Sequence, residues 1–188
     1  MKDWVRPPGP VAPGLRIGLL GGSFNPAHDG HLYNSEVALK ELGLDYVWWL
    51  VSPQNPLKPV EGMAPLVKRV ATARRIAHHP RIRVTDIEQD MGTQFSFDTV
   101  SALKRRFPQV QFVWLMGSDN LAAFRRWRRW ADFARLVPIA VVLRPGSVMK
   151  ALEMRAIGPL AGVTILDGKR NPLSATAIRA GLVGKRPA

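Results

Sequence analysis

The chain of 188 residues contains no cysteine, which excludes disulfides, thiolate metal ligands and cysteine nucleophiles and fits a reducing compartment. No apolar run approaches the roughly 20 residues that a membrane-spanning helix needs, so no membrane partner is expected from a span. Acidic residues are scarce: 14 Asp and Glu stand against 27 Lys and Arg, which gives a formal net charge of +13. Such a basic surface attracts polyanions, whether nucleic acid, an acidic membrane surface or phosphorylated metabolites.

Residues 1–14 are rich in proline and glycine and lack the apolar core of a signal peptide. We expect them to form a disordered lead-in to a single domain over residues 15–188, which is long enough to bury a core. Hydrophobic residues make up 46% of the chain, which favours a globular over a disordered protein. The expected location is the cytoplasm.

Apolar segments of strand length alternate along the chain with segments of helical spacing. Six segments fit strands: Leu15–Leu20, Tyr46–Ser52, Ile82–Thr85, Gln111–Met116, Pro138–Leu143 and Val163–Leu166. Four fit helices: His31–Leu42, Pro65–His78, Asp98–Phe107 after a candidate N-cap at Ser96, and Asn120–Leu136. The alternation predicts an α/β fold with a doubly wound, mostly parallel, Rossmann-like sheet, and such sheets bind ligands beyond the carboxyl ends of their strands.

The most informative segment lies between the first predicted strand and the first predicted helix. Gly21 and Gly22 would let the backbone turn sharply and approach a ligand. Gly30 leaves room for a phosphate between His28 and His31, whose imidazoles can donate hydrogen bonds to phosphate oxygens at a helix N-terminus. Two alternatives stay open here: surface histidines without a function, and a metal site completed by a third ligand.

The motif His28-Asp29-Gly30-His31 resembles the signature of the nucleotidylyltransferase superfamily. Within it the chain is most similar, from about residue 15 to residue 182, to the bacterial nicotinate-nucleotide adenylyltransferases. A second motif, Leu173–Arg179, resembles the family's Ile-Ser-Ser-Thr-x-Ile-Arg, with Leu for Ile and Ala for the second Ser. The hydroxyls of Ser174 and Thr176 with the Arg179 guanidinium would form an anion site, whereas alone they would pass for an ordinary N-cap with a surface arginine.

Three further segments resemble the same family in the same order. Gly117-Ser118-Asp119-Asn120-Leu121 with Trp127 resembles Gly-x-Asp-x-Leu and its tryptophan, which implies nucleotide contacts for Asp119 and stacking of Trp127 on a pyridine ring. An N-cap and a packing role are the alternatives, and packing is expected for Trp114 and Trp130.

The other two segments depart more from the family pattern. Residues 94–99 resemble Ser-Tyr-Thr-x-Asp-Thr, with Gln94, Phe95 and Ser96 in place of the first three residues. This loop is implied to contact the base of the acceptor nucleotide. Asn55–Lys58 corresponds to a Pro-His-Lys segment with Leu57 for His, and Lys58 would meet a phosphate unless it is simply an exposed loop lysine.

The resemblance implies a complete site. The catalytic group would be His28, His31 and Arg179. ATP and phosphate contacts would come from Gly21, Gly22, Ser23, Phe24, Gly30, Lys58, Gly117, Asp119, Ser174 and Thr176. Acceptor contacts would come from Asn25, Phe95, Ser96 and Trp127. No metal ligand is expected from the protein, and Mg²⁺ would be carried mainly by the ATP phosphates.

The reaction implied is adenylyl transfer from ATP to nicotinate mononucleotide, giving nicotinate adenine dinucleotide and pyrophosphate in NAD biosynthesis. Nicotinamide mononucleotide or phosphopantetheine are alternative acceptors. A basic nucleic-acid-binding module acting through Phe124–Trp130 is the alternative from another class, but it leaves the spaced motifs unexplained, so no stable nucleic-acid partner is expected. The sequence indicates no oligomeric state.

Overall fold

The structure, a computed structural model, describes residues 6–54, 61–143, 160 and 162–167. Its centre is one sheet of parallel strands in the order β3-β2-β1-β4-β5-β6, with every neighbouring pair parallel. The strands are β1 (Arg16–Gly22), β2 (Tyr46–Val51), β3 (Ile82–Thr85), β4 (Gln111–Gly117), β5 (Ile139–Val142) and β6 (Thr164–Leu166). The predicted doubly wound parallel sheet is confirmed.

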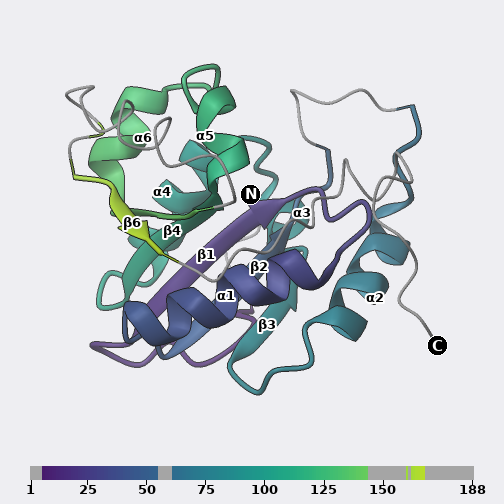
Figure 1. The fold of residues 1–188 in the computed structure, drawn as a ribbon, viewed down its shortest axis with the longest axis horizontal. Coiled ribbons are helices and arrows are strands. Elements are labelled where there is room, and N and C mark those ends of the chain that lie inside the picture. Colours follow the sequence, from purple (N-terminus) through teal and green to yellow (C-terminus); the bar gives the residue numbers. More distant parts are fainter. Residues whose placement is uncertain (1–5, 55–60, 144–159, 161, 168–188) are drawn as a thin grey trace.

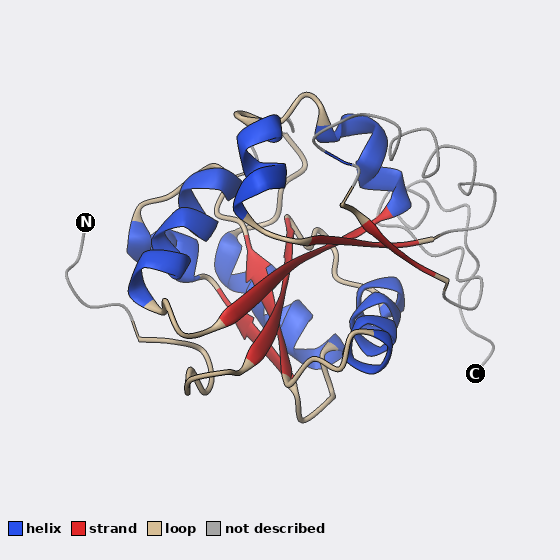
Figure 2. Ribbon diagram, turned by 90° about the vertical axis from the view of Figure 1, so that its left-hand side faces the viewer, coloured by secondary structure: helices blue, strands red, loops and turns tan. Residues whose placement is uncertain are grey.

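Helices cover both faces of this sheet, as Figure 2 shows. One face carries α1 (Asp29–Glu41), which crosses the strands in Figure 1, and α2 (Leu66–Ile76). The other face carries α3 (Ile87–Met91), α4 (Ser96–Arg106), α5 (Ser118–Phe124) and α6 (Trp130–Leu136). Because both faces are covered, the strands can be apolar without alternation, and all six residues of β2 except Tyr46 are buried.

The helix predictions needed three corrections. The expected helix Asn120–Leu136 is two helices, because the chain turns between them and Arg129 adopts a left-handed φ of 55°. Helix α4 begins at Ser96 rather than at Asp98, and its N-cap is Phe95, which gives no side-chain cap. The short α3 was not predicted, because five residues are too few to show helical periodicity.

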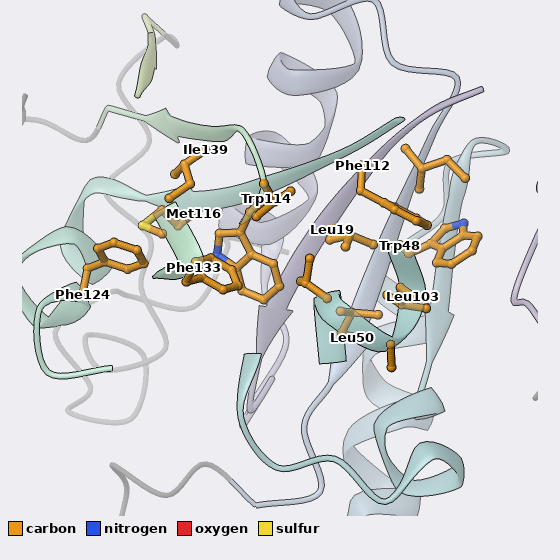
Figure 3. Packing of buried hydrophobic residues seen from close by; sticks show 14 of the residues in the cluster. Leu19, Trp48, Leu50, Leu103, Phe112, Trp114, Met116, Phe124, Phe133 and Ile139 are labelled. Carbon is orange, nitrogen blue, oxygen red and sulfur yellow. The ribbon is translucent and has the colours of Figure 1, made fainter. Parts of the chain in front are cut away.

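Alternate residues of each strand supply the two cores. In Figure 3, Leu19, Leu50 and Trp114 point from neighbouring strands toward the helices of one face. Trp114 is 1% exposed and meets the Phe133 ring edge-on at 5.2 Å, which confirms its packing role, and Trp130 packs against the same cluster. Leu20 points to the opposite face, toward α1 and α2.

Residues 6–14 form neither helix nor strand, yet they lie against the domain. The N–H of Gly14 donates to the Gln109 carbonyl at 3.0 Å, and Val11 packs against the core. This part of the expected disordered lead-in is therefore ordered, while the domain boundary at residue 15 stays a prediction. Among the described residues no helix is long and apolar enough to cross a membrane.

Candidate active site

The site lies where the strand order reverses. Strands β1 and β4 are neighbours, with Leu20 opposite Leu115, yet they are not consecutive in the chain. The loops that follow them therefore leave the same edge of the sheet side by side, with the β2 loop on the far side of β1. In doubly wound sheets this switch point is where ligands bind. The segments after β1, β2 and β4 thus start from the same edge of the sheet.

The structure shows a different reason for glycine at positions 21 and 22 from the one predicted. Both lie within strand β1 with no positive φ, so they are not the turn. A Cβ on Gly21 would overlap the indole of Trp114, whereas the nearest atom to a Cβ on Gly22 is Phe24 Cε2 at 3.5 Å. Gly21 is thus required by core packing. The chain turns later, at Phe24, where φ is 47°.

Phe24 is buried and packs against the first turn of α1, which contains His31. Its ring stacks on Trp49 at 5.1 Å between centroids and lies 4.6 Å from the His31 ring. Trp49 in turn donates its indole N–H to Ser35 Oγ at 2.8 Å, and Ser35 donates to the His31 carbonyl at 2.9 Å. The position of His31 is therefore set by side-chain packing and by hydrogen bonds within the fold.

His28 and His31 cap helix α1 reciprocally. The Gly30 N–H donates to His28 Nδ1 at 3.1 Å, and the His28 N–H donates to His31 Nδ1 at 3.3 Å. The rings lie 3.9 Å apart between centroids, His28 buried and His31 partly so. Side chains that accept from the first free N–H groups of a helix are what fix its start.

This capping arrangement settles which ring nitrogen carries the proton. A nitrogen that accepts a hydrogen bond from a backbone N–H must carry a lone pair, so Nδ1 is unprotonated in both rings. In the neutral imidazole the proton then sits on Nε2, which makes each Nε2 a donor. Protonating Nδ1 would therefore remove a helix cap.

The loop after β4 runs directly into α5. Gly117 is the N-cap residue, Ser118 is buried and Asp119 is exposed in the first turn. Trp127, expected to stack on a ligand, is partly buried and packs edge-on against Trp114 with 5.8 Å between centroids. Its observed contacts are aromatic packing, and its contact with a pyridine ring stays a prediction.

The expected acceptor loop lies at the start of α4. The Phe95 carbonyl accepts from the Thr99 N–H at 3.0 Å, and the Arg128 guanidinium lies 4.7 Å from the centre of the Phe95 ring. Beneath the loop, Thr99 Oγ1 lies 3.0 Å from Glu88 Oε1. Burial raises the pKa of Glu88 to about 7, although hydrogen bonds from the hydroxyls of Thr99 and Ser52 oppose the rise.

Two of the residues that shape the loops were not predicted to do so. Arg69, on α2, donates to main-chain carbonyls of the loops after β1 and β2. The only sequence signal was its position between Leu66 and Val70 on the apolar face of the helix. Asn25 uses its side chain to bind the backbone of Gly62 and Ala64, and its contact with the acceptor stays a prediction.

Several predicted residues lie outside the described ranges: Lys58, Ser174, Thr176 and Arg179. The structure therefore describes the two histidines and the loop that is expected to contact the acceptor. Within the described ranges no group of three or more His, Asp or Glu side chains is placed to hold a metal ion.

Comparison with known proteins places the chain in a family. The model of the cytidylyltransferase-like family matches residues 19–181. A protein of Parvibaculum lavamentivorans named "Probable nicotinate-nucleotide adenylyltransferase" is 50% identical over 187 residues, covering 90% of this chain and 93% of its own. The chain belongs to the cytidylyltransferase-like family. A Gluconobacter oxydans relative of the same name is 50% identical over 183 residues, covering 88% of this chain and 94% of its own.

Two solved structures agree with the fold. "Plasmodium falciparum nicotinic acid mononucleotide adenylyltransferase complexed with NaAD" has a TM-score of 0.75 at 14% identity, covering 92% of this chain and 86% of its own. The same enzyme "complexed with APC" has a TM-score of 0.74 at 14% identity, covering 89% and 84%. At such identity the likeness supports the nucleotidylyltransferase fold, while the relatives support the resemblance seen in the sequence.

Proposed function

We propose that this protein transfers the adenylyl group of ATP to nicotinate mononucleotide, forming nicotinate adenine dinucleotide and pyrophosphate in NAD biosynthesis. The observation that carries the proposal is the reciprocal His28–His31 cap, at the start of the helix that follows β1, beside the point where the strand order reverses. The names of relatives that are half identical over nearly the whole chain support the choice of acceptor.

The reaction is a displacement at the α-phosphorus of ATP. An oxygen of the acceptor 5′-phosphate forms a bond to that phosphorus, and the bond to the β-phosphate bridging oxygen breaks, so pyrophosphate leaves with the electron pair. A phosphate monoester is already an anion near neutral pH. No strong general base is needed, and catalysis rests on alignment and on stabilising charge.

The histidines supply that stabilisation. His28 and His31 would each donate an Nε2–H to oxygens of the α-phosphate as negative charge builds up on them. Because their Nδ1 atoms already accept backbone N–H groups, the rings need not reorient when the substrate arrives. The N-terminus of the 13-residue α1 adds its positive dipole end.

The remaining contacts follow the sequence resemblance. Ser174, Thr176 and Arg179 would hold the leaving pyrophosphate, with Lys58 nearby, while Phe95, Ser96 and Trp127 would contact the acceptor base. Mg²⁺ would reach the site on the ATP phosphates and water, since the described residues offer no carboxylate cluster for it. The cysteine-free composition supports a cytoplasmic location.

The histidine role is tested with a substitution that keeps the function of one ring nitrogen, Nδ1, and removes that of the other, Nε2. Asparagine places its side-chain oxygen near the position of Nδ1 but has no counterpart of the Nε2 donor. We expect His31→Asn to keep the cap and to lower kcat about 100- to 1,000-fold, the usual effect of losing one transition-state donor.

The rate of product formation from ATP and nicotinate mononucleotide is measured by chromatography of the dinucleotide. His78→Ala, which changes an exposed histidine, is the matched control and should retain the wild-type rate. His31→Asn or His31→Ala at the wild-type rate would refute the assigned role.

A further inference from the structure

Arg69 is a buried cation that none of the described carboxylates neutralises. It is 3% exposed, and burial lowers the pKa of its guanidinium with no charged neighbour contributing to the shift. An arginine stays protonated despite such a shift, because its ordinary pKa is so high. Arginine is rarely buried without a partner, so its surroundings must satisfy the guanidinium in some other way.

Main-chain carbonyls from three segments satisfy it. The Arg69 Nη1 atom donates to the Ser23 carbonyl at 2.6 Å and to the Ser52 carbonyl at 2.8 Å. Its Nη2 atom donates to the Pro53 carbonyl at 2.8 Å, and its Nε atom donates to the Ala64 carbonyl at 2.8 Å. One planar group thus joins the loop after β1, the loop after β2 and the residues that lead into α2.

These segments already meet at the sheet edge. Gly22 and Val51 are opposite each other in the register of β1 and β2, and the Ser52 N–H donates to the Gly22 carbonyl at 2.9 Å. Asn25 binds Gly62 and Ala64 from the other side through its amide. The loop after β1 is therefore fixed at Ser23 and again at Asn25, immediately before the capping histidines.

The direction of the Ser23 carbonyl has a consequence for the next peptide N–H. A trans peptide is planar, and its C=O and N–H point in opposite directions. Since the Ser23 carbonyl points inward to Arg69, the N–H of Phe24 points away from Arg69. Backbone N–H groups beside a helix N-terminus are ready donors to phosphate.

We propose that Arg69 is a positioning residue for the adenylyl-transfer site, which fixes the loop after β1 so that its peptide N–H groups face the substrate phosphates. This role rests on the proposed function. The same four hydrogen bonds also stabilise the fold, so stability and activity have to be measured separately. A fork that spans several loops at once is what arginine provides and lysine does not.

The test compares three variants. Arg69→Met keeps most of the side-chain length without donors, Arg69→Lys keeps the charge without the fork, and Arg74→Met changes an exposed arginine of the same helix as control. Melting temperatures are measured first, and kcat and both KM values are then measured well below them. We expect kcat/KM to fall about 100-fold for Arg69→Met, as misplacement by about 1 Å can cause. The kcat/KM of Arg69→Lys should lie between those of Arg69→Met and the wild type, and that of Arg74→Met should match the wild type.

The alternative is that Arg69 only holds the fold together. In that case Arg69→Met or Arg69→Lys melts at a lower temperature while kcat and both KM values of the folded protein stay at wild-type levels, and this result overturns the proposal. If Arg69→Met does not fold, Arg69→Lys decides: wild-type kcat/KM in that variant overturns the role.

ATP binding separates this inference from the proposed function. Isothermal titration calorimetry needs no turnover, so it measures ATP binding even if no dinucleotide forms. If the wild-type protein binds ATP but makes no product with nicotinate mononucleotide, the proposed function fails by itself. Weaker ATP binding by folded Arg69→Met than by Arg74→Met then still supports the positioning role, and equal binding overturns it.

Discussion

Arg69 and Glu88 are both buried beneath the site, and they respond to burial in opposite ways. Arg69 is 3% exposed under the loop after β1 and keeps its charge, which is spread over four hydrogen bonds to carbonyls. Glu88 is 4% exposed beside α4, where hydroxyls are its hydrogen-bond partners. Burial raises its pKa to about 7, so near neutral pH it is partly uncharged.

The difference shows what a buried charge requires. A guanidinium has five donors in a fixed plane, and here the loops supply carbonyls around that plane. A carboxylate needs several donors to stay ionised in such a place, and hydroxyl donors from Thr99 and Ser52 do not outweigh desolvation. The loop after β1 is thus held by a permanent charge, whereas the group buried beside α4 titrates.

The largest effect is expected when the buried cation is removed. Arg69→Met leaves four carbonyls without their donor, and we expect the free energy of unfolding to fall by about 4 kcal/mol. Urea denaturation at pH 7.5 measures it, with Arg74→Met expected within about 0.5 kcal/mol of the wild type. Equal stability of Arg69→Met and the wild type would mean that the four hydrogen bonds contribute nothing.

Removing the buried acid, Glu88, should raise the free energy of unfolding above neutral pH, whereas removing Arg69 lowers it. The pKa of Glu88 is raised from an ordinary 4.5 to about 7 in the folded state. Its contribution to stability is therefore fully present below pH 4.5 and is lost as the pH rises through 7, a total of about 3 kcal/mol. Glu88→Gln cannot ionise, so we expect it to lack this loss and to be more stable than the wild type at pH 8.

The pH dependence itself is the readout for Glu88. Urea denaturation of wild type and Glu88→Gln at pH 5 and pH 8 gives the difference, and Glu41→Gln, at an exposed position, should follow the wild type. If Glu88→Gln and the wild type lose stability in parallel over this range, Glu88 is not the titrating group.

A smaller effect is expected at the partner of Glu88. Thr99 Oγ1 lies 3.0 Å from Glu88 Oε1 and 2.9 Å from Thr93 Oγ1, all buried. Thr99→Val keeps the shape and removes the hydroxyl, so we expect a loss of about 1–2 kcal/mol and a further rise in the pKa of Glu88. Thr72→Val, on the partly exposed side of α2, should cost much less in the same denaturation experiment.

The smallest effect is expected for Arg128, an exposed arginine near the start of α4. Arg128 lies 4.7 Å from the Phe95 ring centre and 3.8 Å from an Asp98 oxygen, and its side chain is 58% exposed. Solvent screens such contacts, so Arg128→Ala should change the free energy of unfolding by about 0.5 kcal/mol or less. A loss of unfolding free energy as large as that of Arg69→Met would contradict the view that burial makes the Arg69 hydrogen bonds strong.

The sequence predicted the sheet well because both of its faces are covered. Strands buried on two sides are short continuous apolar runs, so all six could be located to within about two residues. The helices were harder where local signals were weak: α3 has five residues, and the break between α5 and α6 depends on a left-handed Arg129.

The candidate site was predictable only in part, because motifs name residues but do not show their contacts. The spacing of His28 and His31 indicated a phosphate site, but not that each ring uses Nδ1 as a helix cap. Gly21 looked like a turn residue, whereas it makes room for Trp114 from another strand. Arg69 acts through carbonyls distant in sequence, and no local pattern reports such contacts.

The choice of acceptor is the most direct test of the proposed function. Pyrophosphate release from ATP is measured with nicotinate mononucleotide and nicotinamide mononucleotide side by side, with a sample lacking any acceptor as the blank. We expect release in step with dinucleotide formation and a clearly higher kcat/KM for nicotinate mononucleotide. Preference for the nicotinamide form would contradict the assigned acceptor, and no release above the blank with either would contradict the adenylyl-transfer function itself.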